Sequence, residues 1–119
     1  MADIKLGMVE AHFADIIWEN APMTTKELVA ICQKELNWKR TTTYTVLKKL
    51  CDRGIFETKE HTITVLLPKQ EFHALQSEQF VNENFKGSLP AFIAAFTARN
   101  TLTKEEQTQI RALIESFKE

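Results

Sequence analysis

Two helical patterns separated by a short break constrain the fold of this chain most strongly. The first runs from Thr24 to Leu36, and Thr24 and Glu27 have the spacing of a capping box. The second runs from Thr41 to Arg53 after the break Asn37-Trp38-Lys39, and Gly54 has the position of a residue that ends a helix in the left-handed conformation. Two helices joined by so short a turn are typical of the pair that reads DNA in a helix-turn-helix.

A helix before this pair and a hairpin after it are also predicted. Apolar residues recur at helical spacing from Met8 to Asn20, and Pro22 follows the end of that pattern. The stretches Ile55 to Lys59 and Thr62 to Leu67 have strand patterns, and only Glu60-His61 separates them, as in a tight hairpin. This order predicts a winged helix-turn-helix domain over residues 1–68. The apolar stripe of the first helix is expected to contain Met8, Val9, Phe13, Ile16, Ile17 and Trp18.

Residues 69–119 carry three further helical patterns, so the predicted fold class is mainly α with a small β-hairpin. The first pattern runs from Lys69 to Phe85, Ser88 is a candidate N-cap with Pro90 in the following turn, and Thr103 and Glu106 form another capping box. Three short helices would leave a large apolar patch on a monomer, so we expect a helical dimerisation domain here; folding back onto the first domain is the alternative. The expected dimer interface comprises Phe80, Phe85, Phe92, Ile93, Phe96, Ile110, Leu113, Ile114 and Phe117.

Charge is distributed unevenly along the 119 residues. The formal net charge is −1, yet residues 36–59 hold six basic and two acidic side chains, a local excess of four positive charges. Contacts to phosphate need such local positive charge and not a basic average. The third helix and its flanks are therefore the candidate surface for double-stranded DNA.

A recognition helix enters the major groove with its N-terminal part and its outward face. Hydroxyls of Thr and Tyr can bond to phosphates or base edges, and lysine can reach guanine or phosphate. Lys39 and Arg40 precede the predicted helix and would meet the DNA backbone, while Lys59 and His61 lie at the predicted wing tip. The expected DNA-binding residues are Lys39, Arg40, Thr41, Thr42, Tyr44, Thr45, Lys48, Lys59 and His61.

Several classes of protein are disfavoured by the sequence. No apolar run approaches the length of a membrane span, and Met1 to Lys5 begin no signal peptide, so a cytoplasmic protein is expected. Cys32 and Cys51 are expected to be small buried side chains and not a disulfide. The histidines and cysteines lack metal-site spacing, and neither a nucleophile–base pair nor a Gly-rich phosphate loop is present. We therefore expect no metal, no cofactor and no enzymatic activity.

Six short motifs follow one another along essentially the whole chain. They are Leu6-x3-Glu10, Ile16-Ile17-Trp18, Trp38, Thr42-x5-Lys48-Lys49-Leu50-x3-Gly54, Phe80-x5-Lys86-Gly87 and Leu102-Thr103-x-Glu105-Glu106. In this order and spacing they resemble the penicillinase repressor family of bacterial transcriptional regulators. The resemblance implies a homodimer, with a winged DNA-binding domain and a helical dimerisation domain, that represses promoters by binding an inverted-repeat operator.

Two departures from that family bear on how such a repressor would be induced. In β-lactam-responsive members a sensor-controlled protease cuts between an Asn and a Phe, and the equivalent positions here are Ala95-Phe96. The resemblance thus implies a sensor-linked protease as a partner, whereas Ala95 argues against cleavage by that route. Copper-responsive members carry Cys-x-Cys motifs near the C-terminus, and no cysteine follows Cys51 here, so copper sensing is not expected.

A winged helix can also serve as a protein-interaction adaptor without specific DNA binding. This alternative predicts that charge reversal at Lys48 and Arg40 leaves function intact and that a partner protein co-purifies. The positive excess around the third helix favours DNA binding over the adaptor.

Overall fold

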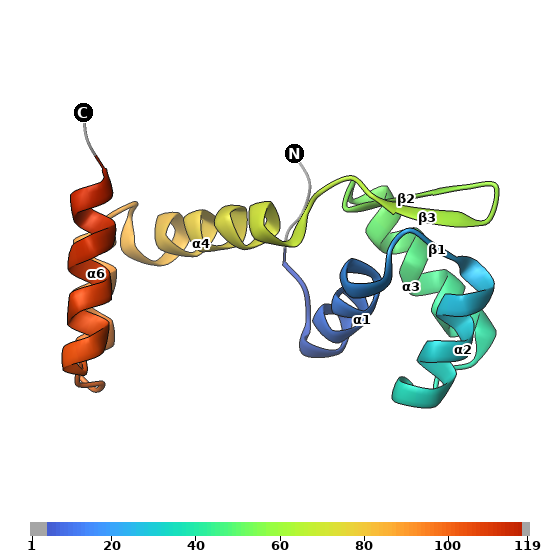
Figure 1. Cartoon of the computed structure of the whole chain (residues 1–119), viewed down its shortest axis with the longest axis horizontal. Helices are drawn as coiled ribbons and strands as arrows, with labels where there is room; N and C mark the ends of the chain where they lie inside the picture. The colour runs from blue at the N-terminus through green and yellow to red at the C-terminus, as the bar shows by residue number, and fades with distance from the viewer. Residues whose placement is uncertain (1–4, 118–119) are drawn as a thin grey trace. The chain divides into compact units, whose positions relative to one another are not determined.

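The computed structural model describes residues 5–117, which form six helices and three strands in two compact units (Figure 1). The first unit extends to Ser77 and the second begins at Glu78. The predicted class, mainly α with a small β-structure, is confirmed. In chain order the elements are α1 (Met8–Asn20), β1 (Met23–Thr24), α2 (Thr25–Leu36), α3 (Arg40–Asp52), β2 (Phe56–Lys59), β3 (Thr62–Val65), α4 (Lys69–Phe85), α5 (Leu89–Thr97) and α6 (Lys104–Ser116).

The helix-turn-helix forms where the sequence predicts it. The Thr24 hydroxyl oxygen accepts the Glu27 N–H at 3.1 Å, and the Thr24 N–H donates to Glu27 Oε1 at 2.9 Å, so the predicted capping box is confirmed. Asn37 ends α2 in the left-handed conformation, with φ of 55°, which asparagine tolerates better than most residues. Trp38 then stacks on Phe13 of α1, with ring centroids 5.4 Å apart. The short turn is therefore fixed to the core.

The core of the first unit lies between α1, α2, α3 and the sheet. From α3 it takes Thr43, Leu47 and Leu50, whose spacing places them on one face of the helix. From the hairpin it takes Phe56 and Ile63, both fully buried. Packing on these residues leaves the opposite face of α3 free to face solvent.

Helix α1 has its predicted bounds, but its apolar stripe is shorter than predicted. Phe13 and Ile17 are fully buried. Met8 and Val9, by contrast, are 90% and 54% exposed. The first turn of α1 extends beyond the core, so these two positions of the predicted stripe are wrong.

The predicted hairpin is confirmed, with strands shorter than predicted. β2 pairs with β3 in antiparallel register along Phe56–Lys59. The connecting residues have positive φ, 50° at Glu60 and 64° at His61, as in the two-residue turns that match the twist of paired strands. Ile55 is outside the ladder because its N–H donates to Leu50 O at 3.1 Å, at the end of α3.

A third strand joins the hairpin, which the sequence pattern does not predict. β1 pairs with β3 in antiparallel fashion, with Met23 opposite Ile63, so the sheet order is β1-β3-β2. Just beyond it, the Thr25 N–H donates to His61 O at 2.9 Å. A strand of two residues is too short for a pattern of alternation. Its effect is to hold the tip of the hairpin at the start of α2.

The beginning of α4 packs on the first unit. Phe72 is buried, and its ring centroid lies 5.3 Å from that of Trp18. Trp18 Nε1 donates to Leu67 O at 3.0 Å, and Lys69 Nζ pairs with Asp15 Oδ1 at 2.9 Å. The first compact unit therefore continues past residue 68, where the sequence pattern places the domain boundary.

The second unit buries no side chain fully within its described residues, 78–117. Phe92 of α5 packs edge-on against Phe80 and Phe85 of α4, with ring centroids 5.8 Å and 5.5 Å away. In α6, Leu113 and Ile114 are 60% and 63% exposed. The predicted N-caps Ser88 and Thr103 are confirmed by their hydrogen bonds to backbone N–H groups. Side-chain caps thus fix where α5 and α6 begin, but the described residues of this unit leave an extensive apolar surface exposed.

We predict that Phe72→Ala lowers the free energy of unfolding of the first unit by about 3 kcal/mol, because a buried ring is removed and a cavity remains. Leu75→Ala is the matched control, since Leu75 lies one turn further along α4 and is 39% exposed. Urea denaturation followed by tryptophan fluorescence reports the change through Trp18. An equal loss of stability in both variants would contradict the docking of α4 through Phe72.

Candidate nucleic-acid interface

The outward face of α3 carries hydroxyl groups and one lysine. Because Thr43, Leu47 and Leu50 face the core, the opposite side of α3 faces solvent. Lys48 Nζ lies 3.4 Å from Asp52 Oδ2 one turn further on, and both side chains are well exposed. Within this face, Thr41, Thr42, Thr45 and Lys48 are exposed and Tyr44 is half-buried.

The N-terminal end of α3 differs by one residue from the prediction. Arg40 is the first residue of the helix and does not precede it, while Lys39 is the N-cap. The Arg40 guanidinium lies over the Tyr44 ring, 5.6 Å from its centroid. Hydrogen bonding to the Thr25 hydroxyl lowers the pKa of Tyr44, and the neighbouring Arg40 lowers it further. Tyr44 is thus held between α2 and Arg40. The first turn of α3 contains no acidic residue, so the N-terminal end of this helix suits a phosphate group.

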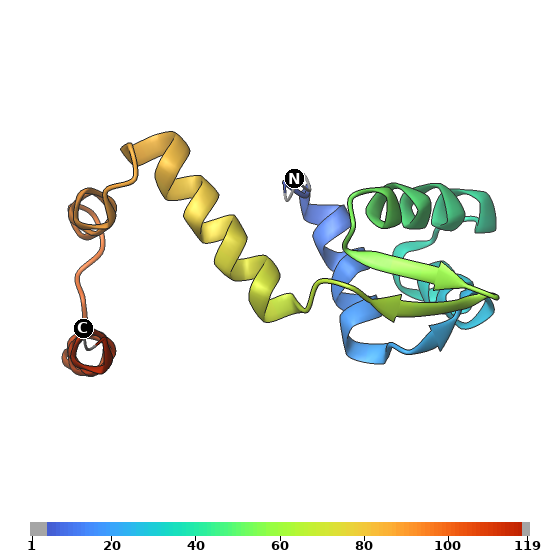
Figure 2. The ribbon, with the colours of Figure 1, turned by 90° about the horizontal axis from the view of Figure 1, so that it is seen from above.

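The hairpin lies beside α3 (Figure 2). Lys59 and His61 are both exposed at its tip, as predicted for a wing. A recess of about 280 Å³ separates α3 from the hairpin. Its walls include Tyr44 and Lys48 from the helix, and Thr58 and His61 from the hairpin. Three of the predicted DNA-binding residues, Tyr44, Lys48 and His61, therefore line the same recess. Lys59, the other predicted residue of the wing, does not line it.

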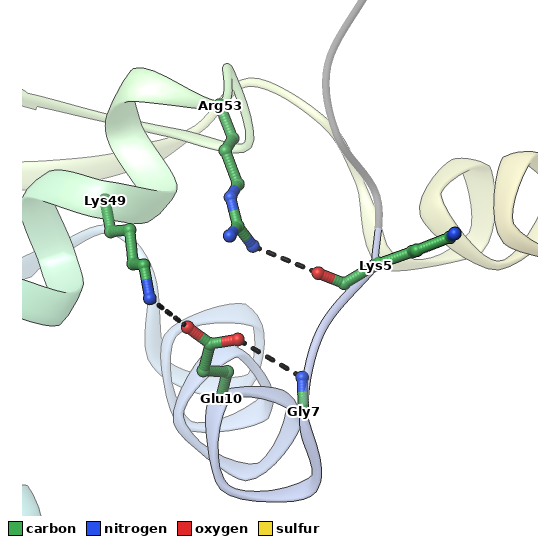
Figure 3. Close-up of polar contacts among 5 residues, drawn as sticks. All are labelled: Lys5, Gly7, Glu10, Lys49 and Arg53. Carbon is green, nitrogen blue, oxygen red and sulfur yellow. Dashed lines mark hydrogen bonds and ion pairs between the residues drawn. The ribbon is translucent and has the colours of Figure 1, made fainter.

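Two basic residues of the positively charged segment turn towards α1 (Figure 3). Lys49 Nζ pairs with Glu10 Oε2 at 3.1 Å, and Arg53 Nη1 donates to Lys5 O at 3.0 Å. The excess of positive charge counted along the sequence therefore does not all lie on the outward face of α3. Sequence reasoning missed Glu10 as a partner because 39 residues separate it from Lys49.

The sequence profile described as "Penicillinase repressor" matches residues 6–116, which covers both compact units. The chain belongs to the penicillinase repressor family. The resemblance seen in the six short motifs is thereby confirmed. Membership places the protein among bacterial transcriptional repressors, a family of regulators and not of enzymes.

Two curated relatives match along almost their whole length. The chain is 24% identical over 118 residues to the penicillinase repressor of Bacillus licheniformis, covering 96% of this chain and 92% of the relative. It is 19% identical over 114 residues to the methicillin resistance regulatory protein MecI of Staphylococcus aureus, covering 92% of this chain and 93% of the relative. Both relatives therefore align with the winged unit and with the C-terminal helices.

The candidate cleavage pair of this family member lies in regular structure. Ala95 and Phe96 are both inside α5, and both are exposed. Proteases prefer exposed loop tips to helical backbone, so α5 would have to open locally before a cut at this bond.

Two further features of residues 5–117 bear on the class of the protein. No helix among them has the length and apolar character needed to cross a membrane. No group of three or more His, Cys, Asp or Glu side chains in that range is arranged to hold a metal ion.

The two cysteines differ in their surroundings, and this yields a prediction. Cys32 is fully buried, and burial raises the pKa of its thiol to about 11, whereas Cys51 is half-buried beside Thr58. Below that pKa the thiol form dominates, and the thiolate is the reactive species. In a Cys51→Ser variant we expect Cys32 to resist a chromogenic thiol reagent in native buffer near neutral pH and to react fully in denaturant. Rapid labelling of the native variant would contradict the burial of Cys32.

Proposed function

We propose that this repressor binds double-stranded DNA sequence-specifically, as a homodimer on an inverted-repeat operator, with α3 as the recognition helix. The observation that carries the proposal is the division of α3 into a buried apolar face and an exposed face of hydroxyls and Lys48. A helix so divided, with the hairpin beside it, suits insertion into a major groove. The names of the two relatives, a penicillinase repressor and a resistance regulatory protein, agree with a role in repression.

The roles of individual side chains follow from their hydrogen bonds. The Thr45 hydroxyl donates to Thr41 O at 2.9 Å. Its oxygen therefore remains an acceptor, which suits the amino group of adenine or cytosine, and its methyl suits the methyl of thymine. Lys48 has only donors and suits guanine O6 and N7 or a phosphate. Thr42 and Tyr44 lie on opposite edges of this face and would contact base edges or phosphate from there.

The flanking cations have a different proposed role. Lys39 and Arg40 lie at the N-terminal end of α3, and Lys59 and His61 lie at the hairpin tip. We assign them to phosphates, which fix the register of a protein on the duplex without reading sequence. One copy offers few such contacts, and a two-fold dimer on a dyad site doubles them.

The dimer is proposed to form through the second unit. Its described residues leave Phe96 and Leu113 exposed by 49% and 60%, and Phe117 by 79%. An apolar surface of this kind is costly to leave in water, and a second copy of the same surface covers it with two-fold symmetry. The proposed interface comprises Phe80, Phe85, Phe92, Ile93, Phe96, Ile110, Leu113, Ile114 and Phe117.

Selection from random duplexes tests the DNA-binding proposal. We expect the wild-type protein to enrich a dyad-symmetric site. Thr45→Ala should change the preference at one base pair per half-site by about 1–3 kcal/mol if Thr45 reads a base. The control Lys59→Gln should instead weaken all sequences alike and reduce the salt dependence by about 0.9 in slope for each phosphate that it no longer neutralises. Recovery of no enriched dyad site would refute the proposal, and co-purification of a partner protein in its place would favour the adaptor.

Sedimentation velocity tests the dimer. Leu113→Asp, or Phe96→Asp, should convert the dimer to a monomer because either would place an unpaired carboxylate in an apolar interface. Thr108→Asp is the matched control, since Thr108 lies on the other side of α6 and its hydroxyl donates to Lys104 O. The control should remain dimeric. A dimer that survives Leu113→Asp would remove α6 from the interface.

A further inference from the structure

One carboxylate joins the N-terminal segment to the end of α3 (Figure 3). Glu10 lies in the first turn of α1, where its Oε1 accepts the Gly7 N–H at 3.2 Å and its Oε2 pairs with Lys49 Nζ at 3.1 Å. Close by, Arg53 Nη1 donates to Lys5 O at 3.0 Å. Two side chains one turn apart at the C-terminal end of α3 are thus held by α1 and by the segment before it.

The surroundings of Glu10 keep it ionised. Its side chain is 22% exposed, against 56% for Lys49. The hydrogen bond from the Gly7 backbone lowers the pKa of Glu10, and Lys49 and Arg53 lower it further. Glu10 therefore carries its negative charge at neutral pH. Ion pairs as exposed as this one contribute little to the free energy of unfolding. The effect considered below is therefore on the orientation of α3.

The two ends of α3 are fixed by different contacts. The stacking of Trp38 on Phe13 holds the turn before the helix. In the second half of the helix, Leu50 is fully buried. The pair formed by Glu10 and Lys49 is a polar anchor of the C-terminal end. Without this pair, the packing of Leu47 and Leu50 and the hydrogen bond from Arg53 to Lys5 O would still hold this end, but with one polar contact fewer.

We propose that Glu10 is a positioning residue for DNA recognition, which holds Lys49 and so keeps the outward face of α3 in the orientation that fits the groove. This inference rests on the proposed function. Glu10 itself does not touch DNA, and Lys49 makes no phosphate contact while it is paired. Without the pair, α3 spends part of its time in orientations that do not bind, and the apparent Kd rises by the inverse of the competent fraction.

The test compares Glu10→Gln, Lys49→Gln and the double variant with wild type, on the selected duplex and on a random duplex, at several salt concentrations. Gln at position 10 retains an oxygen for the Gly7 N–H, so α1 keeps its cap. Glu19→Gln, at the other end of α1 and exposed, is the matched control for removal of one carboxylate. Fluorescence anisotropy gives the affinity, and thermal unfolding confirms that each variant is fully folded during the titration.

We expect each single variant to weaken specific binding about two- to fivefold, the range of one partly exposed ion pair. The double variant should be no weaker than the singles, because both remove the same interaction. The salt slope and binding to the random duplex should stay at wild-type values. If the pair were only structural, the variants would differ from wild type in stability and not in their affinity for the selected duplex.

Three results would overturn the inference. If Glu10→Gln tightens binding while Lys49→Gln lowers the salt slope by about 0.9, Lys49 contacts phosphate directly. If both variants lower the melting temperature but bind with wild-type affinity, the pair is structural only. If wild type selects no duplex at all, the proposed function fails and the positioning role fails with it. The first two results leave DNA recognition by α3 intact.

Discussion

Burial of one face of α3 is the interaction on which the rest of the first unit depends. Thr43, Leu47 and Leu50 recur at helical spacing and pack against α1, α2 and the hairpin. The same periodicity turns Thr45 and Lys48 outward. The hydrophobic effect that folds the unit therefore also selects which polar side chains are presented to a partner. The recognition chemistry proposed for α3 is therefore a consequence of core packing and not a separate feature of the fold.

Elements specified by neighbouring residues were predictable from sequence. The capping boxes at Thr24 and Thr103 place the starts of α2 and α6 because their hydrogen bonds join residues three apart. Features that depend on distant partners were not. β1 forms only because it pairs with β3. Glu10 and Lys49 form an ion pair although 39 residues separate them in the sequence. Met8 and Val9 have the helical period of buried residues, but no part of the core covers them. The exposed face of α3 was predictable for the same reason, since it lies on one continuous helix.

The two units divide the work of the proposed repressor. The first has a closed core and an exposed polar face on α3, and the described part of the second exposes apolar side chains that one copy does not cover. Helix α4 links the two because Phe72 belongs to the first core and Phe80 to the aromatic cluster with Phe92.

The most direct test of the account is a methylation-protection footprint of the wild-type protein on its selected duplex, which reports guanine N7 in the major groove and adenine N3 in the minor groove. Two copies of α3 on one face of the duplex should protect two major-groove segments whose centres lie about 10 bp, or a multiple of one helical turn, apart. Both segments should become protected over the same range of protein concentration. Protection of a single segment, or of the minor groove alone, would contradict recognition by paired α3 helices.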